Sequence, residues 1–231
     1  MKIYGYSERG IVNSIIFNIG DNKRLITEFI KLIPVLSEID QPDDYDILLE
    51  QSFSQFGTSD LIVIAYYNNP KKKLILFFEA KVKANKKNWT LNKHFEYFNS
   101  LLDYKEKHDK ILNGRAPHYA SNLFYQLYLK EFLIRNIENL DNNIPIKDIL
   151  NISRKIGNNE IVKKAVEMLK GVRPNCYYIG IVPSMEKQCM KLNFNEQMIH
   201  FLSWNKIEDF AKANVLNKVL DIFQFNRGQI Y

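Results

Sequence analysis

Residues 57–83 read Gly-Thr-Ser-Asp-Leu-Ile-Val-Ile-Ala-Tyr-Tyr-Asn-Asn-Pro-Lys-Lys-Lys-Leu-Ile-Leu-Phe-Phe-Glu-Ala-Lys-Val-Lys, and this stretch decides the fold. Two apolar runs are separated by Asn68-Asn69-Pro70 and a cluster of lysines. Short apolar runs rich in β-branched and aromatic residues, bounded by such turn residues, are typical of β-strands. The pattern therefore predicts strands at 59–67 and 73–82 joined by a tight turn.

Asp60, Glu79 and Lys81 stand at the ends of these two strands that lie away from the turn. Asp60 opens the first, and Glu79 and Lys81 lie near the end of the second, where alternation places both on one face and Ala80 on the other. Burying such groups alone is costly. The functional explanation is a metal site, because carboxylates suit Mg²⁺ and Lys81 would stabilise charge on a phosphate. The structural alternative is a hairpin with one cross-strand ion pair at its rim.

Asp60 followed by Glu79-Ala80-Lys81 after 79 − 60 = 19 positions resembles the PD-(D/E)XK nuclease (restriction-endonuclease-like) superfamily. The resemblance implies that Asp60 and Glu79 bind a divalent metal, Mg²⁺ or Mn²⁺, and that Ala80 adds its backbone carbonyl as a ligand. It also implies that Lys81 is the catalytic lysine, which assists the attacking water. Ser59 stands where the proline that gives the motif its name would be.

The N-terminal region, residues 8–33, has apolar residues at helical spacing, and Gly20-Asp21-Asn22 is a candidate break between two helices. The resemblance implies that a glutamate of the first helix is directed at the metal site, and Glu8 stands at that position. Arg9 would then meet a phosphate. The structural alternative for Glu8 is a glutamate that favours a helix N-terminus through the helix dipole.

Basic residues flank the second strand. The interval 71–93 contains eight lysines and one acid, and Lys83, Lys86 and Lys87 follow the strand directly. We predict that these three contact a nucleic-acid backbone, whose phosphates bind lysine clusters. A solvated lysine-rich surface is the alternative.

A further apolar helix is predicted at 121–138, with Gln126 and Lys130 one turn apart on the same face. RecB-like members of the resembled superfamily carry a Gln-x-x-x-Tyr pair on the helix after the catalytic strands. Gln126 matches that pair, whereas Lys130 replaces the tyrosine. Both are predicted to bind nucleic acid, and a polar stripe on a half-buried helix is the alternative.

The order of the predicted elements gives the fold class. A strand at 46–56 precedes the two strands described above, strands at 176–182 and 198–204 follow, and 205–214 is a helix. We expect a single α/β domain over residues 1–231, with the αβββαβ core that the resemblance implies and a central mixed sheet flanked by helices. Helical insertions are expected at about 84–120 and 139–175.

Composition narrows the function classes. The net charge of +6 favours an anionic partner, and two cysteines are too few for a disulfide framework or a zinc site. The four histidines lack metal-ligand spacing. The chain has no apolar run of membrane-spanning length and no signal-peptide pattern at its N-terminus, so we expect a cytoplasmic protein without a membrane partner.

Together these features predict a metal-dependent nuclease that hydrolyses phosphodiester bonds. DNA is the favoured substrate and endonuclease action the favoured mode, with restriction or phage defence as a plausible setting. Cutting both strands of a duplex with one site per chain would favour a homodimer. Two alternatives remain: an inactive nucleic-acid-binding or partner-binding module of the same fold, and an unrelated α/β fold in which Asp60 and Glu79 lie too far apart to share an ion.

Overall fold

The computed structural model describes residues 7–82, 90–107, 121–142, 144–171, 175–183, 193–194 and 197–230. The strands are β1 (Asp44–Ser52), β2 (Thr58–Asn68), β3 (Lys71–Ala80), β4 (Ile146–Lys147), β5 (Ser153–Arg154), β6 (Asn175–Val182), β7 (Asn193–Phe194) and β8 (Gln197–Ser203). The α-helices are α1 (Ser7–Ile19), α2 (Lys23–Lys31), α3 (Leu91–Lys107), α4 (Leu123–Arg135), α5 (Glu160–Leu169), α6 (Trp204–Ala213), α7 (Asn217–Phe225) and α8 (Arg227–Ile230). Short 3₁₀ turns are η1 (Pro34–Leu36), η2 (Ser54–Phe56) and η4 (Ile137–Asn142).

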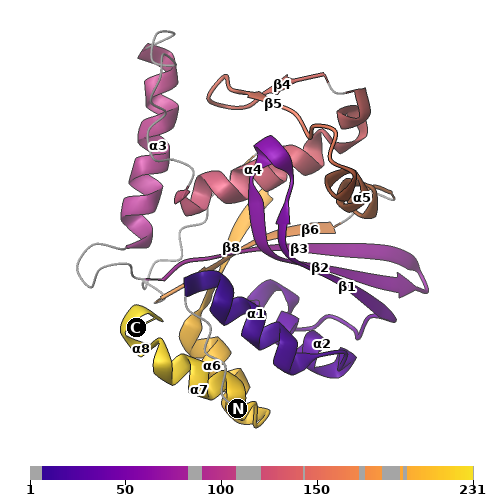
Figure 1. Ribbon diagram of the computed structural model, residues 1–231, viewed down its shortest axis with the longest axis vertical. Coiled ribbons are helices and arrows are strands. Elements are labelled where there is room, and N and C mark those ends of the chain that lie inside the picture. Colours follow the sequence, from indigo (N-terminus) through magenta and orange to yellow (C-terminus); the bar gives the residue numbers. More distant parts are fainter. Residues whose placement is uncertain are drawn as a thin grey trace.

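The centre of the fold is a mixed sheet, whose strands in the described chain lie in the order β1-β2-β3-β6-β8-β7. β1, β2 and β3 form an antiparallel meander, β6 lies parallel to β3, and β8 lies parallel to β6. Parallel neighbours need a crossover connection. The chain passes from β3 to β6 by way of α3, α4 and α5 (Figure 1). The expected α/β architecture with a mixed central sheet is confirmed.

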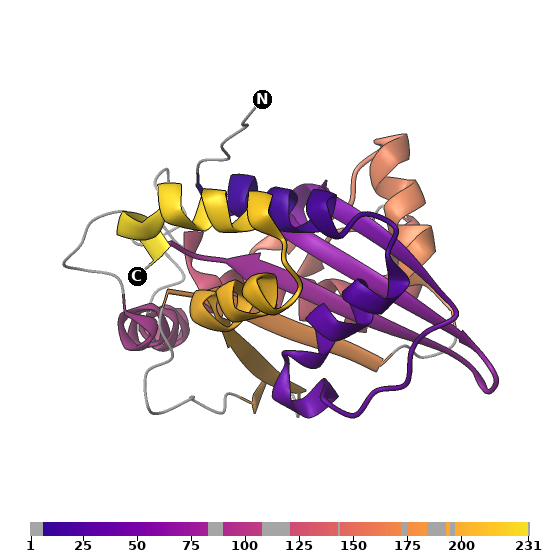
Figure 2. The ribbon, with the colours of Figure 1, turned by 90° about the horizontal axis from the view of Figure 1, so that it is seen from below.

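Helices cover both faces of this sheet. In Figure 1, α1, α2, α6 and α7 lie below it, whereas α4 and α5 lie above and α3 stands at the end where β3 finishes. Figure 2, seen from below, shows α7 running beside α1, and the two helices are in contact. Each face has its own apolar core, with Phe29 and Trp204 in the lower one and Phe124 and Phe201 in the upper one.

The alternation expected along the second hairpin strand is present in β3. Leu76 and Phe78 belong to the lower core, and Ile75 and Phe77 belong to the core beneath α4. Glu79 continues the second series by two residues and so faces α4.

Most expected elements are confirmed, and one strand end is corrected. α1 ends at Ile19, and Asn22 begins α2 by accepting a hydrogen bond from the Leu25 N–H, so the break at 20–22 is confirmed. The strand expected at 46–56 ends at Ser52. The chain then turns through η2 because Phe53 and Phe56 are both drawn into the core under α4.

The expectation that residues 139–175 are helical is only partly right. α5 and the turn η4 are present, but β4 and β5 form a small antiparallel hairpin between them. Its turn includes Asn151 at a φ of 61°, a left-handed conformation that asparagine tolerates better than most residues. Asp148 holds the turn by accepting the N–H groups of Leu150 and Ile152. Local turn chemistry therefore overrides helix propensity here.

The described part of the chain contains no helix that combines the length and the apolar character needed to cross a membrane.

Candidate active site

The hairpin register places Asp60 beside Glu79. Leu61 pairs with Phe78 in the β2–β3 ladder, so the next step toward the strand ends puts Asp60 opposite Glu79. Asp60 Oδ2 accepts a hydrogen bond of 2.8 Å from the Ala80 N–H. Both carboxylates are buried, with Asp60 4% and Glu79 3% exposed. The 19-residue spacing in the sequence is thus the spacing that makes the two acids neighbours in an antiparallel hairpin.

Lys81 shares this site and is fixed through its main chain. Its Nζ lies 3.1 Å from Glu79 Oε1. Its N–H donates to the carbonyl of Ile181 on β6, and its own carbonyl accepts from the Trp204 indole N–H at 2.9 Å. The main chain of Lys81 is therefore fixed by β6 and by α6, while its ammonium group lies beside the Glu79 carboxylate.

The first turn of α1 reaches the same end of the sheet. Arg9 Nε lies 3.5 Å from Asp60 Oδ1, and Arg9 Nη1 lies 3.7 Å from Glu50 on β1. Glu8 Oε1 accepts a long hydrogen bond of 3.4 Å from the Val82 N–H, next to Lys81. The structure thus brings Glu8 and Arg9 to the strand ends that carry Asp60, Glu79 and Lys81. Arg9 is half-exposed, so its side chain can leave Asp60 for another anion.

α4 contributes Lys130 to the interior of the site. This lysine is 1% exposed, and its Nζ donates a hydrogen bond of 2.9 Å to the Phe56 carbonyl. Gln126, one turn earlier, is partly buried, and its Oε1 has no hydrogen-bond partner among the described residues. Lys83, Lys86 and Lys87 lie outside the described residues, so their predicted contacts remain predictions.

The electrostatics of the site follow from burial and crowding. Burial raises the pKa of Glu79, Lys81 opposes that rise, and the charge of Asp60 adds to it. Burial lowers the pKa of Lys130, whereas Glu79 and Asp60 act in the opposite direction. These four groups therefore form one electrostatically linked cluster with two acids and two bases.

His94, on α3, lies near the site. Its position in the sequence does not predict this proximity. Its Nδ1 accepts the Leu123 N–H at 3.2 Å, and the Asn122 amide donates to its carbonyl at 2.7 Å. Burial, assisted by the charge of Lys81, lowers the pKa of His94 to about 4. Only the packing of α3 against α4 brings this histidine near the strand ends.

The oxygen donors suit a hard divalent cation. The candidate ligands are the carboxylates of Asp60 and Glu79 and the Ala80 carbonyl, with Glu8 at the edge. Mg²⁺ is commonly held by one or two carboxylates and keeps several waters, so this small donor set is compatible with it. Within the described ranges, no group of three or more His, Cys, Asp or Glu side chains is arranged to hold a metal ion. Any cation would therefore rely on water for much of its coordination.

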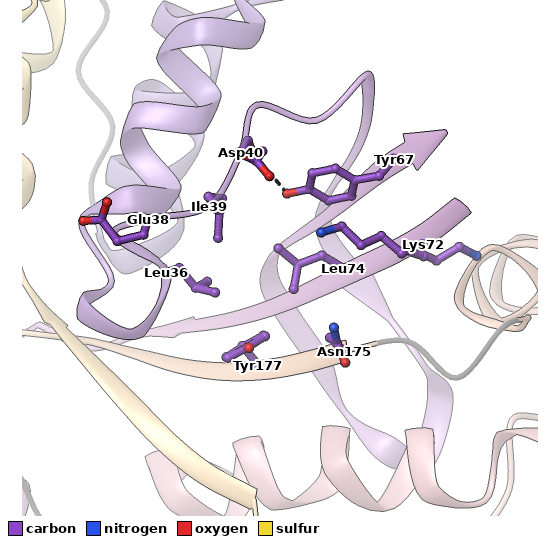
Figure 3. A pocket seen from close by; sticks show the side chains of 10 residues that line it. Leu36, Glu38, Ile39, Asp40, Tyr67, Lys72, Leu74, Asn175 and Tyr177 are labelled. Atoms are coloured by element: carbon purple, nitrogen blue, oxygen red, sulfur yellow. Dashed lines mark hydrogen bonds between the residues drawn. The ribbon is translucent and has the colours of Figure 1, made fainter. Parts of the chain in front are cut away.

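A separate pocket lies at the opposite end of the same strands. Its volume is about 260 Å³, and it is lined by residues from the end of β2 and the starts of β3 and β6, together with Leu36 of η1 and the segment that follows it. Figure 3 shows Tyr67, Lys72, Leu74 and Tyr177 around it, with the Tyr67 hydroxyl donating to the Asp40 carbonyl. None of the predicted site residues lines this pocket.

Comparison of the chain with protein-family models, with curated proteins and with solved structures found no match. The functional assignment therefore depends on the geometry of the strand ends.

Proposed function

We propose that the protein is a metal-dependent nuclease of the PD-(D/E)XK type, with a restriction-endonuclease-like fold, that hydrolyses phosphodiester bonds. The observation that carries the proposal is the meeting of Asp60, Glu79 and Lys81 at the ends of β2 and β3. The mixed sheet, with α1 on one face and α4 on the other, supports it at the level of architecture. Catalytic activity depends on the residues of such a site and not on the fold alone, so the experiments below test the site.

In this proposal Asp60, Glu79 and the Ala80 carbonyl hold a divalent cation, Mg²⁺ or Mn²⁺. When bound, the cation acts as a Lewis acid that stabilises the negative charge developing on the phosphate. Lys81 orients the attacking water and stabilises charge on the phosphate oxygens, a role that its fixed main chain favours. Water oxygen forms the new bond to phosphorus while the bond to the leaving oxygen breaks. The products are a phosphate monoester and a hydroxyl group.

DNA is the proposed substrate, with a nucleic-acid backbone approaching the strand ends. Arg9 is the best-placed described residue to contact a phosphate next to the cleaved bond. Its side chain is 53% exposed, and its two carboxylate partners lie at 3.5 and 3.7 Å, longer than a close ion pair. Phosphate is a better bidentate partner for arginine than these distant acids.

One observation favours the second candidate, an inactive nucleic-acid-binding or partner-binding module. Both Asp60 oxygens and one Glu79 oxygen already contact protein groups, namely the Ala80 N–H, Arg9 and Lys81. Carboxylates whose oxygens find hydrogen-bond and ion-pair partners without a metal are also typical of a purely structural ion-pair cluster. Calorimetric titration with Mn²⁺ separates the two, because the module would give no binding heat that depends on Asp60.

Cleavage of supercoiled plasmid tests the nuclease. Wild type is compared with Lys81→Ala in Mg²⁺, in Mn²⁺ and in EDTA, beside Lys72→Ala as a matched control. Lys72 is an exposed lysine at the other end of the same strand. We expect metal-dependent nicking by wild type and Lys72→Ala, and a loss of at least about a hundredfold in Lys81→Ala. Nicking that persists in Lys81→Ala would contradict the assigned site.

A further inference from the structure

Glu50 has a backbone conformation that a strand residue rarely adopts. It lies on β1 at a φ of 49°, and non-glycine residues with a positive φ are uncommon. Leu48 packs against the core beneath α4, so regular alternation would direct Glu50 to the same face of the sheet. The Glu50 carboxylate instead contacts α1, which packs on the opposite face. The left-handed backbone therefore turns this carboxylate toward α1.

The two oxygens of the Glu50 carboxylate contact different residues of α1. Oε1 accepts a hydrogen bond of 2.7 Å from the Asn13 amide, and Oε2 lies 3.7 Å from Arg9 Nη1. Arg9 and Asn13 are four residues apart, so they share one face of the helix. Asn13 Oδ1 is buried and has no hydrogen-bond partner among the described residues. The hydrogen bond to Glu50 is thus the contact that orients the Asn13 amide.

The strand register explains why one arginine reaches two acids. Leu49 pairs with Leu61 in the β1–β2 ladder, so the next step along the strands places Glu50 opposite Asp60. Like charges on opposite residues of neighbouring strands repel each other. Arg9 contacts both carboxylates and so compensates for this repulsion.

Glu50 gives the Arg9 guanidinium a second carboxylate besides Asp60. Arg9 Nε lies 3.5 Å from Asp60 Oδ1, whereas Nη1 faces Glu50. Two acceptors restrict the orientation of a guanidinium more than one does, because its N–H groups form a fixed, planar fork. Neither contact uses Nη2, which can therefore donate to an incoming phosphate oxygen. An arginine that is already oriented loses less side-chain entropy when it binds.

We propose that Glu50, oriented by Asn13, is a positioning residue that holds Arg9 for contact with a phosphate of the DNA substrate. The inference rests on the proposed function, because the phosphate belongs to the substrate of that site. It also predicts the sign of a charge effect. Removing a carboxylate beside a nucleic-acid site normally strengthens binding, because the acid repels phosphates. Loss of the Glu50 charge should instead weaken binding, since the orientation of Arg9 is lost with it.

Two assays test the inference: fluorescence anisotropy with a labelled DNA duplex in EDTA, and steady-state nicking of supercoiled plasmid in Mg²⁺. Wild type is compared with Glu50→Gln, Asn13→Ala and Arg9→Met. Glu28→Gln is the matched control, because Glu28, on α2, lies 3.5 Å from Arg24 Nε and its side chain is 39% exposed, against 40% for Glu50. We expect Glu50→Gln to raise the Kd and the KM about threefold with kcat unchanged. Asn13→Ala, which keeps the net charge, should raise both by less, and Glu28→Gln should change neither.

A double-mutant cycle separates a positioning role from a structural one. If Glu50 acts through Arg9, Glu50→Gln should not weaken DNA binding further in a protein that already carries Arg9→Met. A structural defect would add to the effect of Arg9→Met, and urea unfolding would show it as a loss of stability in Glu50→Gln. Asn13→Ala takes the place of Glu50→Gln in the cycle if the latter does not fold.

Unchanged or tighter DNA binding by Glu50→Gln, or additive effects in the cycle, would overturn the inference. Metal-dependent nicking by wild type would leave the proposed function intact in that case. If wild type binds the duplex without nicking plasmid, the proposed function is contradicted, and the Kd values of the cycle still decide the role of Glu50. Absence of both binding and nicking in wild type would overturn the inference and the proposed function together.

Discussion

Replacing Glu79 with Gln should stabilise the metal-free protein at alkaline pH and, under the proposed function, remove its affinity for a divalent metal. Burial raises the pKa of Glu79 to about 7, against the opposing charge of Lys81. A carboxyl group whose pKa rises on folding binds more protons in the folded chain than in the unfolded chain, between the two pKa values. The contribution of Glu79 to stability is therefore lost as the pH rises through this window.

The size of the effect follows from the shift. The pKa of Glu79 rises from the ordinary value of 4.5 to about 7, a shift of 7 − 4.5 = 2.5. At 1.36 kcal/mol for each pKa unit, this shift corresponds to a loss of about 3 kcal/mol in the free energy of unfolding. Glutamine keeps an oxygen that can accept the Lys81 Nζ hydrogen bond, now 3.1 Å long. We expect Glu79→Gln to exceed wild type by about 1 to 3 kcal/mol in free energy of unfolding at pH 8, and to equal it near pH 4.

Urea unfolding in EDTA at several pH values between 4 and 8 measures this difference. The pKa of His94 is lowered, so its effect on stability has the opposite sign, but it occurs in both proteins and cancels in the comparison. Glu160→Gln is the control, because Glu160 is exposed at the start of α5 and pairs only with Lys163 in the described structure. A Glu79→Gln protein that is less stable at pH 8, or an offset that does not depend on pH, would refute the reasoning.

Two further substitutions test η2, the turn beside Lys130, and the β4–β5 hairpin that contacts this turn through Gln55. Gly57→Ala should cost about 2 kcal/mol in free energy of unfolding, measured in urea, because its φ of 80° and ψ of −175° are a conformation essentially confined to glycine. Gly20→Ala, at a φ of 60° with no atom within 4 Å of the added Cβ, should cost less, and an equal loss would contradict the steric argument. Arg154→Met should cost about 3 kcal/mol, because it leaves the fully buried Asp148 carboxylate without its ion pair of 2.8 Å. A loss below about 1 kcal/mol would show that Asp148 is satisfied by its other partners.

The hairpin and its acids could be predicted from the sequence because the relevant physics is local. Alternation along β3 places Glu79 and Lys81 on one face whatever the rest of the chain does. The short turn at 68–70 fixes the register, and the register makes Asp60 the neighbour of Glu79. Local turn geometry and a period of two residues were therefore enough to find the acids and Lys81.

The depth of Lys130 could not be predicted, because spacing on a helix specifies a face but not what covers that face. Gln126 and Lys130 share a stripe, yet Lys130 is buried against η2, a turn that lies 74 residues earlier in the chain. His94 was missed for the same reason. α7 was also not predicted, although Val219, Ile222 and Phe223 are buried at helical spacing, a signal that the sequence does contain.

The site lies at the end of the sheet, where helices from both of its faces come together. This position explains how several charged groups are accommodated beside an apolar sheet. α1 contributes Arg9 from one face of the sheet, and α4 contributes Lys130 from the other face. The indole N–H of Trp204, on α6, fixes Lys81 by donating to the Lys81 carbonyl. Each group is oriented by an element that also packs in a core, so its position does not depend on the charges alone. A field built in this way would require little reorganisation during the phosphodiester hydrolysis proposed above, and such preorganisation is what electrostatic catalysis needs.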